Sequence, residues 1–157
     1  MAAYKKKNEK KITQKFTPND KHIAQGGDPD HYYTESPAWV FSNADKEKWA
    51  FTKEGVGDIF WDEIFPYLSE LERKTWQEIL VTEKKKNHSI ELNGLNACAK
   101  KRLADLHIEA ESLISLRLTG NKRIYGFMTG RAFSILWFDA NHGDNFDCVC
   151  RSRLKNT

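Results

Sequence analysis

Two arginines and a tyrosine stand at the start of an aromatic stretch near the C-terminus, and a histidine stands at its end. Arg117 and Arg123 flank a turn, Tyr125 follows in "RIYGF", and His142 closes "WFDANH". A guanidinium group gives paired, charge-assisted hydrogen bonds to a phosphate. Imidazole titrates near neutral pH and can take or give a proton. Metal-free RNA cleavage needs a base, an acid and cations at the phosphate, so these side chains suit that reaction.

Other residues could take part in the same reaction or hold the RNA. His88, in the basic stretch "EKKKNHSIEL", could be the second proton-transfer group, or an ordinary loop histidine. Tyr125 could stack on a base or donate a proton. Lysines would hold the RNA backbone, although a run of lysines is also what a solvated loop carries. The candidates for that contact are Lys84, Lys85, Lys86, Lys100 and Lys101.

The main candidates have structural alternatives. Arg117 and Arg123 could form salt bridges with the acidic middle of the chain. Tyr125 could be a partly buried strand aromatic, and His142 could hydrogen-bond to Asp139. Catalysis requires Arg123 and His142 to reach one phosphate, whereas simple binding tolerates their separation.

A metal site is a weaker interpretation. His142, Cys148 and Cys150 in "HGDNFDCVC" could supply three ligands, but the spacing matches no zinc pattern and no fourth ligand is evident. We therefore predict no metal and no cofactor. The odd number of cysteines, three, does not suggest a disulfide framework and fits a cytoplasmic protein.

A sheet must position the aromatic stretch. Alternation with a period of two predicts antiparallel strands at about 112–118, 123–128 and 132–139. Loops of three residues (119–121) and of two residues then fix the register. One face would be the core face, with Ile114, Leu116, Leu118, Ile124, Phe133, Ile135 and Trp137. The other face would carry Arg117, Arg123, Tyr125, Ser134, Leu136 and Phe138.

Two amphipathic helices precede these strands. Apolar residues recur with helical spacing over residues 58–80 and 94–107. Pro66 predicts a break and Ser69-x-x-Glu72 a capping box, which places the main helix at about 70–81. We expect an α+β domain in which both helices pack on one sheet face, leaving the face with the arginines partly open.

The remaining chain is organised around this domain. Residues 1–35 are predicted to be a flexible basic and polar segment, 36–150 a single domain, and 151–157 a basic tail. Alternating aromatics on either side of "SNAD" predict a hairpin, with Trp39 and Phe41 on one strand and Trp49 and Phe51 on the other.

The net charge of +3 is unevenly distributed. Residues 22–83 carry five basic and thirteen acidic residues, whereas residues 84–157 carry thirteen basic and seven acidic residues. The basic C-terminal half is a possible footprint for a polyanion, and uneven surface charge is the alternative. No apolar run is long enough to span a membrane and no signal peptide is evident, so we expect a cytoplasmic protein.

The stretch "SLRLTGNKRIYGFMTGRAFSILWFDANH" resembles the strand pattern of the RelE/ParE-like toxin superfamily, and the resemblance covers about residues 58–142. It implies two helices on an antiparallel meander and a toxin that a cognate antitoxin protein wraps. Some members cleave ribosome-bound mRNA and others poison gyrase. We therefore expect a toxin-like endoribonuclease, an mRNA interferase, with RNA as its partner. The N-terminal fifty residues depart from these shorter toxins. The alternative is a non-catalytic module that binds nucleic acid or protein through the same face.

Overall fold

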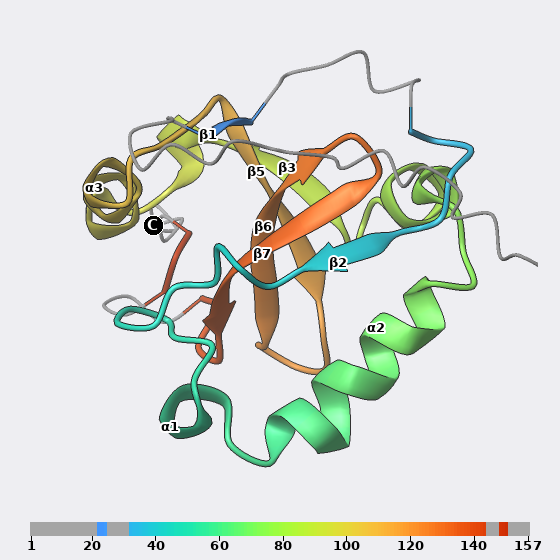
Figure 1. Ribbon diagram of the computed structural model, residues 1–157, viewed down its shortest axis with the longest axis horizontal. Coiled ribbons are helices and arrows are strands. Elements are labelled where there is room, and N and C mark those ends of the chain that lie inside the picture. Colours follow the sequence, from blue (N-terminus) through green and yellow to red (C-terminus); the bar gives the residue numbers. More distant parts are fainter. Residues whose placement is uncertain (1–21, 25–31, 144–147, 151–157) are drawn as a thin grey trace, which may run out of the picture.

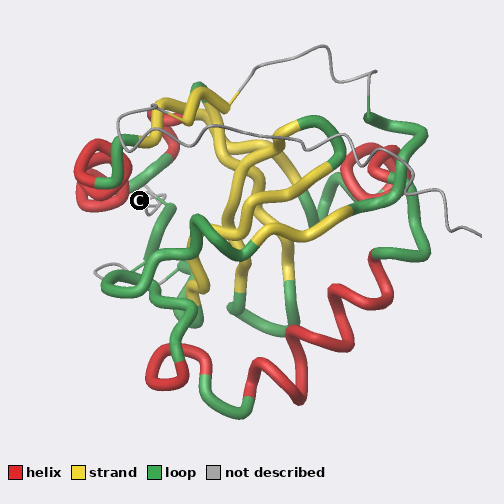
Figure 2. Tube along the Cα trace, viewed as in Figure 1, coloured by secondary structure: helices red, strands yellow, loops and turns green. Residues whose placement is uncertain are grey.

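The structure is a computed structural model that describes residues 22–24, 32–143 and 148–150. The predictions made for residues 1–21, 25–31 and 151–157 lie outside these residues. The described chain is an α+β domain around a five-stranded mixed sheet with the strand order β2-β7-β6-β5-β3 (Figure 1). Figure 2 shows the helical segments distributed around this central sheet. Within the described residues, no helix has the length and apolar character needed to cross a membrane.

The predicted meander is present at its predicted place. Strands β5 (Ser112–Arg117), β6 (Arg123–Thr129) and β7 (Ala132–Asp139) are antiparallel neighbours. Arg117 lies opposite Arg123, and the Leu118 N–H donates to the Lys122 carbonyl, so residues 119–121 form the predicted three-residue loop. Thr129 lies opposite Ala132 across a two-residue turn. The left-handed backbone that such turns require falls on Gly120 and Gly130, with φ of 57° and 58°.

A bulge changes the two faces near the end of β7. Tyr125 lies opposite Trp137, while the next residue, Gly126, lies opposite Ile135. Leu136 is therefore an extra residue on β7. The predicted faces of Trp137 and Phe138 are wrong for this reason: Trp137 packs on the same side as Tyr125, and Phe138 on the opposite side with Ile124.

Gly126 lies where β7 packs closely against β6. A Cβ atom there would lie 2.6 Å from a ring carbon of Phe133 and would overlap the Ser134 carbonyl. We expect Gly126→Ala to destabilise the fold by about 3 kcal/mol or more, because backbone would have to move. Gly130→Asn is the control, since that position is open and asparagine tolerates its backbone. Chemical denaturation of both variants measures the difference, and equal stability would contradict the account.

Both edges of the sheet differ from the prediction. Strand β3 (His88–Glu91) pairs antiparallel with β5, although these residues were predicted to be a loop. Strand β2 (Ala38–Val40) pairs in parallel with β7, so the predicted aromatic hairpin is wrong. The two predicted arms still touch through the Phe41 and Phe51 rings, with centroids 6.3 Å apart, and the Phe51 N–H donates to the Asp45 carbonyl. Strand β1 (His22–Ala24) pairs in parallel with β4 (Ile108–Ala110).

The first helical region is continuous across Pro66. After the short α1 (Lys53–Val56), a π-helical turn at Phe60–Ile64 leads directly into α2 (Phe65–Leu71). Pro66 lies in the first turn of α2, directly after the π-helical turn, and the helix continues through it. Ser69 is not an N-cap, since its hydroxyl donates to the Phe65 carbonyl. The predicted break at Pro66 is therefore wrong.

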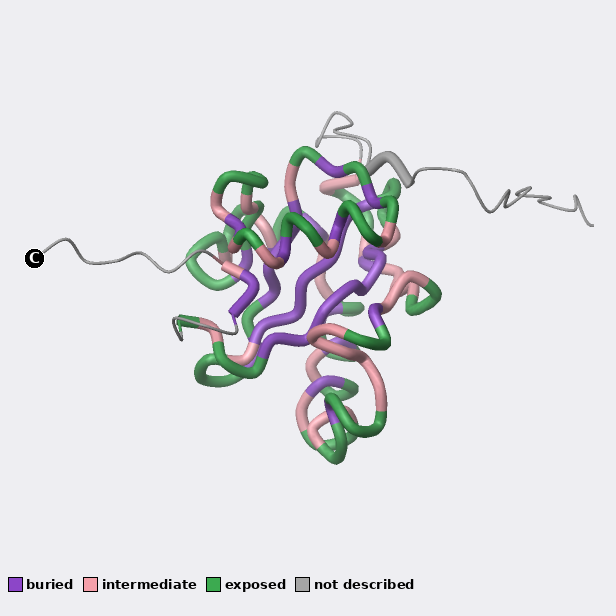
Figure 3. Tube along the Cα trace, turned by 90° about the vertical axis from the view of Figure 1, so that its left-hand side faces the viewer, coloured by how far each residue is buried: buried purple, intermediate pink, exposed green. Residues whose placement is uncertain are grey.

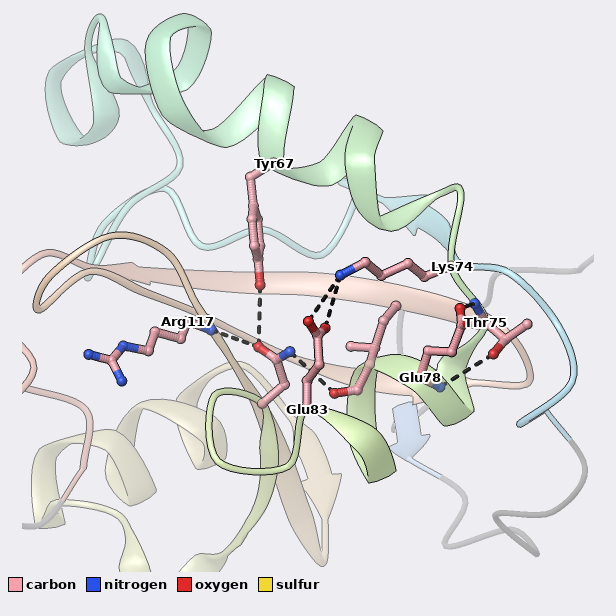
Figure 4. Close-up of polar contacts among 8 residues, drawn as sticks. Tyr67, Lys74, Thr75, Glu78, Glu83 and Arg117 are labelled. Atoms are coloured by element: carbon pink, nitrogen blue, oxygen red, sulfur yellow. Dashed lines mark hydrogen bonds and ion pairs between the residues drawn. The ribbon is translucent and has the colours of Figure 1, made fainter.

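The helix breaks after α2 instead, and a different capping box begins the next turn. Figure 4 shows the Thr75 N–H donating to the Glu78 carboxylate and the Glu78 N–H donating to the Thr75 hydroxyl. This reciprocal pair precedes a second π-helical turn at Glu78–Thr82. The last helices are a 3₁₀ turn at Leu92–Gly94 and α3 (Ala97–Asp105), which lies within the predicted range.

The helices cover opposite faces of the sheet rather than one. Leu68, Trp76 and Ile79 pack against one face, and Leu95, Ala99 and Leu103 pack against the face that carries Tyr125. Figure 3 shows the strands as a buried layer between these elements. The prediction of an open face is therefore wrong, because both faces carry apolar rows.

The domain also begins earlier than predicted. Tyr32 and Tyr33 pack against the first core, and the Glu35 carbonyl accepts a hydrogen bond from the Trp76 N–H. These residues had been assigned to the flexible segment that ends at residue 35.

Candidate functional site

Strand register places the two predicted arginines, His88 and Tyr125 in two adjacent rows on one face of the sheet. The first row runs His88, Ser115, Tyr125 across β3, β5 and β6. The second row, two residues further along each strand, runs Arg117, Arg123, Asp139 across β5, β6 and β7. Residues opposite each other, and residues two apart on a strand, share a face. The predicted loop length produces this arrangement.

His142 returns from the end of β7 to the first row. Its Nδ1 atom lies 3.1 Å from the Tyr125 hydroxyl, and its backbone N–H donates to the Asn121 carbonyl. The Tyr125 hydroxyl also lies 3.0 Å from the Cys150 sulfur and hydrogen-bonds with Ser115. Because Nδ1 is held in this way, Nε2 is the ring nitrogen left for a substrate.

Tyr125 itself does not meet solvent. Its ring is 0% exposed, and burial, together with the neighbouring Cys150, raises its pKa far above the ordinary value. Stacking on a base, as predicted for an open face, is excluded in this structure. Its geometry suits it to orient His142.

Arg117 and Arg123 are a like-charged pair directly opposite each other on adjacent strands. Such a pair is destabilising unless an opposite charge lies nearby. Among the residues that the structure describes, neither arginine forms an ion pair within 4 Å, so the predicted alternative of salt bridges to the acidic middle segment finds no support there. That segment pairs with Lys122 instead, through Glu63 at 2.7 Å.

The two arginines differ in exposure. Arg117 is exposed, whereas Arg123 is 9% exposed and one terminal nitrogen, Nη1, donates to the Gly120 and Lys122 carbonyls. Burial and then the charge of Arg117 lower the pKa of Arg123. The turn thus fixes Arg123 in place and leaves Arg117 able to reach outward.

The electrostatics favour a neutral His142. Burial and the charge of Arg123 lower its pKa below the ordinary 6.5, and the opposing effect of Asp139 does not reverse this. Charges on His88 and Arg117 act in the same direction. A neutral imidazole at pH 7 can accept a proton.

Asp139 anchors the end of β7. Its carboxylate oxygens accept hydrogen bonds from the backbone N–H groups of Asn141 and Val149. Burial raises its pKa, although these hydrogen bonds and the charges of His142 and Arg123 act against the rise. In place of the alternative hydrogen bond between His142 and Asp139, this arrangement holds both His142 and residues 148–150 near the rows.

Asn87 links these two rows of residues to the other face of the sheet. Its Oδ1 accepts hydrogen bonds from the Arg117 N–H and the Tyr67 hydroxyl, and its Nδ2 donates to the Ile79 carbonyl. A cleft of about 490 Å³ lies beside these contacts, between α2 and the end of β5. Figure 4 shows the Arg117 guanidinium pointing away from Tyr67 and Lys74. Asn87 therefore holds the backbone at Arg117 while leaving the side chain free to point away.

Only some of the predicted lysines lie near the two rows. Lys84, Lys85 and Lys86 are exposed in the turn that precedes Asn87 and His88. Lys100 and Lys101 are exposed on α3, and no contact described here joins them to the two rows. The first group is therefore the better placed for a chain that passes the arginines.

A second polar network holds α3 over this face. Asp45 is buried and accepts hydrogen bonds from Arg102 at 2.7 and 2.9 Å and from the Trp137 indole at 3.0 Å. Burial opposes its ionisation, but the hydrogen bonds from Arg102, the backbone and Trp137 outweigh burial and lower the pKa to about 2.

This network predicts acid sensitivity. The folded-state pKa of Asp45 is below the ordinary 3.8. Ionised Asp45 therefore stabilises the fold above about pH 4, by about 2 kcal/mol, and this contribution is lost as the pH falls towards 2. We expect the difference in unfolding free energy between the wild type and Asp45→Asn to shrink over that range. Urea denaturation at several pH values measures it, and a difference that does not vary with pH would contradict the assignment.

Sequence reasoning missed Ser115, Cys150 and Asp45 as parts of these networks. Ser115 was visible only as the polar member of an alternating strand, and Cys150 only as a possible metal ligand. Among the described residues, no group of three His, Cys, Asp or Glu side chains is arranged to hold a metal ion.

Comparison of the chain with protein-family models, with curated protein sequences and with solved structures found no match. The chemistry of the site therefore rests on the residues themselves.

Proposed function

We propose that this protein is a toxin-like endoribonuclease, an mRNA interferase, that cleaves RNA without a metal. The observation that carries the proposal is the cross-strand pair of Arg117 and Arg123, which forms no ion pair in the part of the chain that the structure describes, beside His142, whose pKa is lowered. Two adjacent cations that form no ion pair within 4 Å among the described residues suit a phosphate, and a neutral imidazole next to them suits removal of a nearby proton.

The reaction assigns one role to each group. Nε2 of His142 accepts the proton of the ribose 2′-hydroxyl, whose oxygen attacks the neighbouring phosphorus. The two arginines stabilise the charge that develops on the phosphorane. The bond from phosphorus to the 5′ oxygen then breaks, and His88 gives that oxygen a proton. The products are a 2′,3′-cyclic phosphate and a 5′-hydroxyl. Tyr125 is a positioning residue that holds Nδ1 of His142.

The biological setting is part of the same proposal. An α+β fold with a meander agrees in outline with the RelE-like resemblance, and helices on both faces are a departure from the arrangement it implied. The proposal places the protein in the cytoplasm, acting on free or ribosome-bound mRNA, with an antitoxin protein as its inhibitor. Lys84, Lys85 and Lys86 would guide the RNA towards Arg117.

One observation favours the second candidate function, a binding module without catalysis. Arg123 is mostly buried and already donates to two carbonyls, so Arg117 alone reaches outward freely. In that case the same surface would hold RNA, DNA or an acidic protein, and His142 would not transfer a proton.

Controlled expression in a bacterium distinguishes the two. We expect growth arrest with new mRNA ends, mapped by primer extension, and loss of both in Arg117→Ala and His142→Ala proteins that fold normally by circular dichroism. Lys101→Ala, a charge change on α3, is the control and should remain toxic. Growth arrest without new ends, or equal toxicity of His142→Ala, would contradict the nuclease proposal.

A further inference from the structure

The solvent side of the helix around α2 is aromatic. Trp61 is 67% exposed and Phe65 is 52% exposed, and their ring centroids lie 5.6 Å apart. Phe41, 44% exposed, adjoins Phe60, whose ring centroid is 5.0 Å from that of Trp61. Contiguous exposed aromatics in a chain with a well-filled core mark an interaction surface more often than an accident of folding.

This helix already has one apolar face, which is buried in the core of the domain. Ile64, Leu68 and Leu71 are buried against the sheet. Trp61 and Phe65 are four residues apart and form a second apolar stripe where polar residues are usual. The π-helical turn at Phe60–Ile64 lies within this stretch, and such turns occur often at functional sites.

A shallow cavity adjoins the stripe. It has a volume of about 310 Å³, and Phe41, Phe51, Val56, Phe60 and Trp61 contribute its apolar lining. The cavity can receive an apolar side chain from a partner, with Trp61 at its border. Trp residues of this kind are common anchors in protein interfaces.

The charge of the surrounding segment indicates which kind of partner would bind. Residues 53–72 carry one basic and six acidic residues. Asp62 and Glu70 are exposed on the helix, and Asp58 is exposed in the turn before it. Lys46 and Lys53 line the cavity itself and no carboxylate of the described residues does, so the acidic side chains lie outside the cavity, along the helix and the turn before it. This charge disfavours a polyanion and favours a cation-rich partner.

We propose that the surface of Phe41, Trp61 and Phe65 docks a cationic amphipathic helix of a protein partner. The apolar stripe of that helix would pack against Trp61 and Phe65, with one apolar side chain in the cavity. Its lysines or arginines would face Asp58 and Asp62. The proposal is independent of the proposed nuclease activity, because none of these residues belongs to the two rows of the candidate site.

Fluorescence anisotropy of labelled synthetic peptides tests the proposal. The probe is a Leu/Lys peptide of about 15 residues with helical spacing, a length at which an isolated helix becomes marginally stable. The comparison peptides are a Leu/Glu counterpart and a scrambled Leu/Lys sequence. We expect the Leu/Lys helix to bind most tightly, and its binding to weaken with rising ionic strength.

Variants connect that binding to the surface. Trp61→Ser with Phe65→Ser should weaken it at least about tenfold, and Asp58→Asn with Asp62→Asn should remove most of its salt dependence. Leu92→Ser, an exposed apolar position elsewhere, and Glu91→Gln with Asp105→Asn are the matched controls. Trp61→Ser alone provides a milder change if the double variant folds poorly.

Several results would overturn the proposal. These are failure of the Leu/Lys helix to bind at low ionic strength, equal binding of the Leu/Glu peptide, and unchanged binding by the Trp61→Ser protein. Self-association lost in Trp61→Ser, measured by sedimentation without peptide, would assign the surface to a second copy of the chain. Binding of a single-stranded oligonucleotide that depends on Trp61 would assign it to nucleic acid.

Discussion

His142→Ala is expected to lower the rate of RNA cleavage by about 10²- to 10⁴-fold, the range that a positioned general base contributes. The proposed reaction takes the 2′-hydroxyl proton through Nε2 of this residue, and Tyr125 holds the opposite ring nitrogen at 3.1 Å. The measurement is single-turnover cleavage of a labelled RNA by purified protein. Tyr125→Phe should cause a smaller loss, because it releases the ring of His142 but keeps the base.

The pH profile distinguishes a base from a structural histidine. Because His142 must be neutral to act, the rate should fall as the pH drops below its lowered pKa, and because the general acid must be protonated, the rate should fall again at higher pH. Arg117→Gln removes one of the charges that lower the pKa of His142, so the fall on the acid side should begin at a higher pH. A profile that does not move in Arg117→Gln, or an unchanged rate in His142→Ala, would contradict the role.

Asp45→Ala is expected to destabilise the fold by about 3 to 5 kcal/mol. The change leaves the Trp137 indole N–H and the N–H groups of Glu47 and Lys48 without this acceptor, and removes the buried partner of Arg102. The resulting unsatisfied groups, more than the lost attraction, account for the cost. Equilibrium unfolding in urea measures it.

Glu47→Ala is the matched control. Glu47 pairs with the same arginine at 3.2 Å, but its side chain is 78% exposed, so its loss should cost less than about 1 kcal/mol. Similar effects of the two substitutions would show that Asp45 is not the group that ties α3 to the sheet.

The meander was predictable because its signals are local. Alternation over residues 112–139 and two glycine turns are enough to determine which residues face each other, and so Arg117, Arg123 and Tyr125 were placed together correctly on one face. The bulge at Leu136 does not show in the alternation, and it lies where β7 packs closely against Gly126. The faces of Trp137 and Phe138 were wrong as a result.

The predictions for the two edge strands of the sheet were wrong for a common reason, because both strands form through long-range contacts. Strand β3 is short and polar, and it forms because β5 offers a free edge. Strand β2 pairs with a strand more than ninety residues later rather than with its neighbour. The position of α3, opposite to α2, follows from apolar rows on both faces, and helical periodicity alone does not choose between the faces.

The structure brings the predicted arginines, histidines and tyrosine close together, but their exposure differs from the prediction. Arg117, Arg123, His88 and His142 come together, while Tyr125 lies beneath them instead of on an open surface. Cys150, which contacts the Tyr125 hydroxyl, belongs to a segment whose path over the sheet no local pattern indicates.

The central claim is best tested by the ends that the purified protein leaves on RNA. Labelled RNA would be incubated with the protein in the presence of EDTA, and the products would be analysed for terminal groups. The account predicts 2′,3′-cyclic phosphate and 5′-hydroxyl ends, absent with His142→Ala. Intact RNA that is nevertheless bound by the wild type would contradict catalysis and leave the two arginines as a binding site.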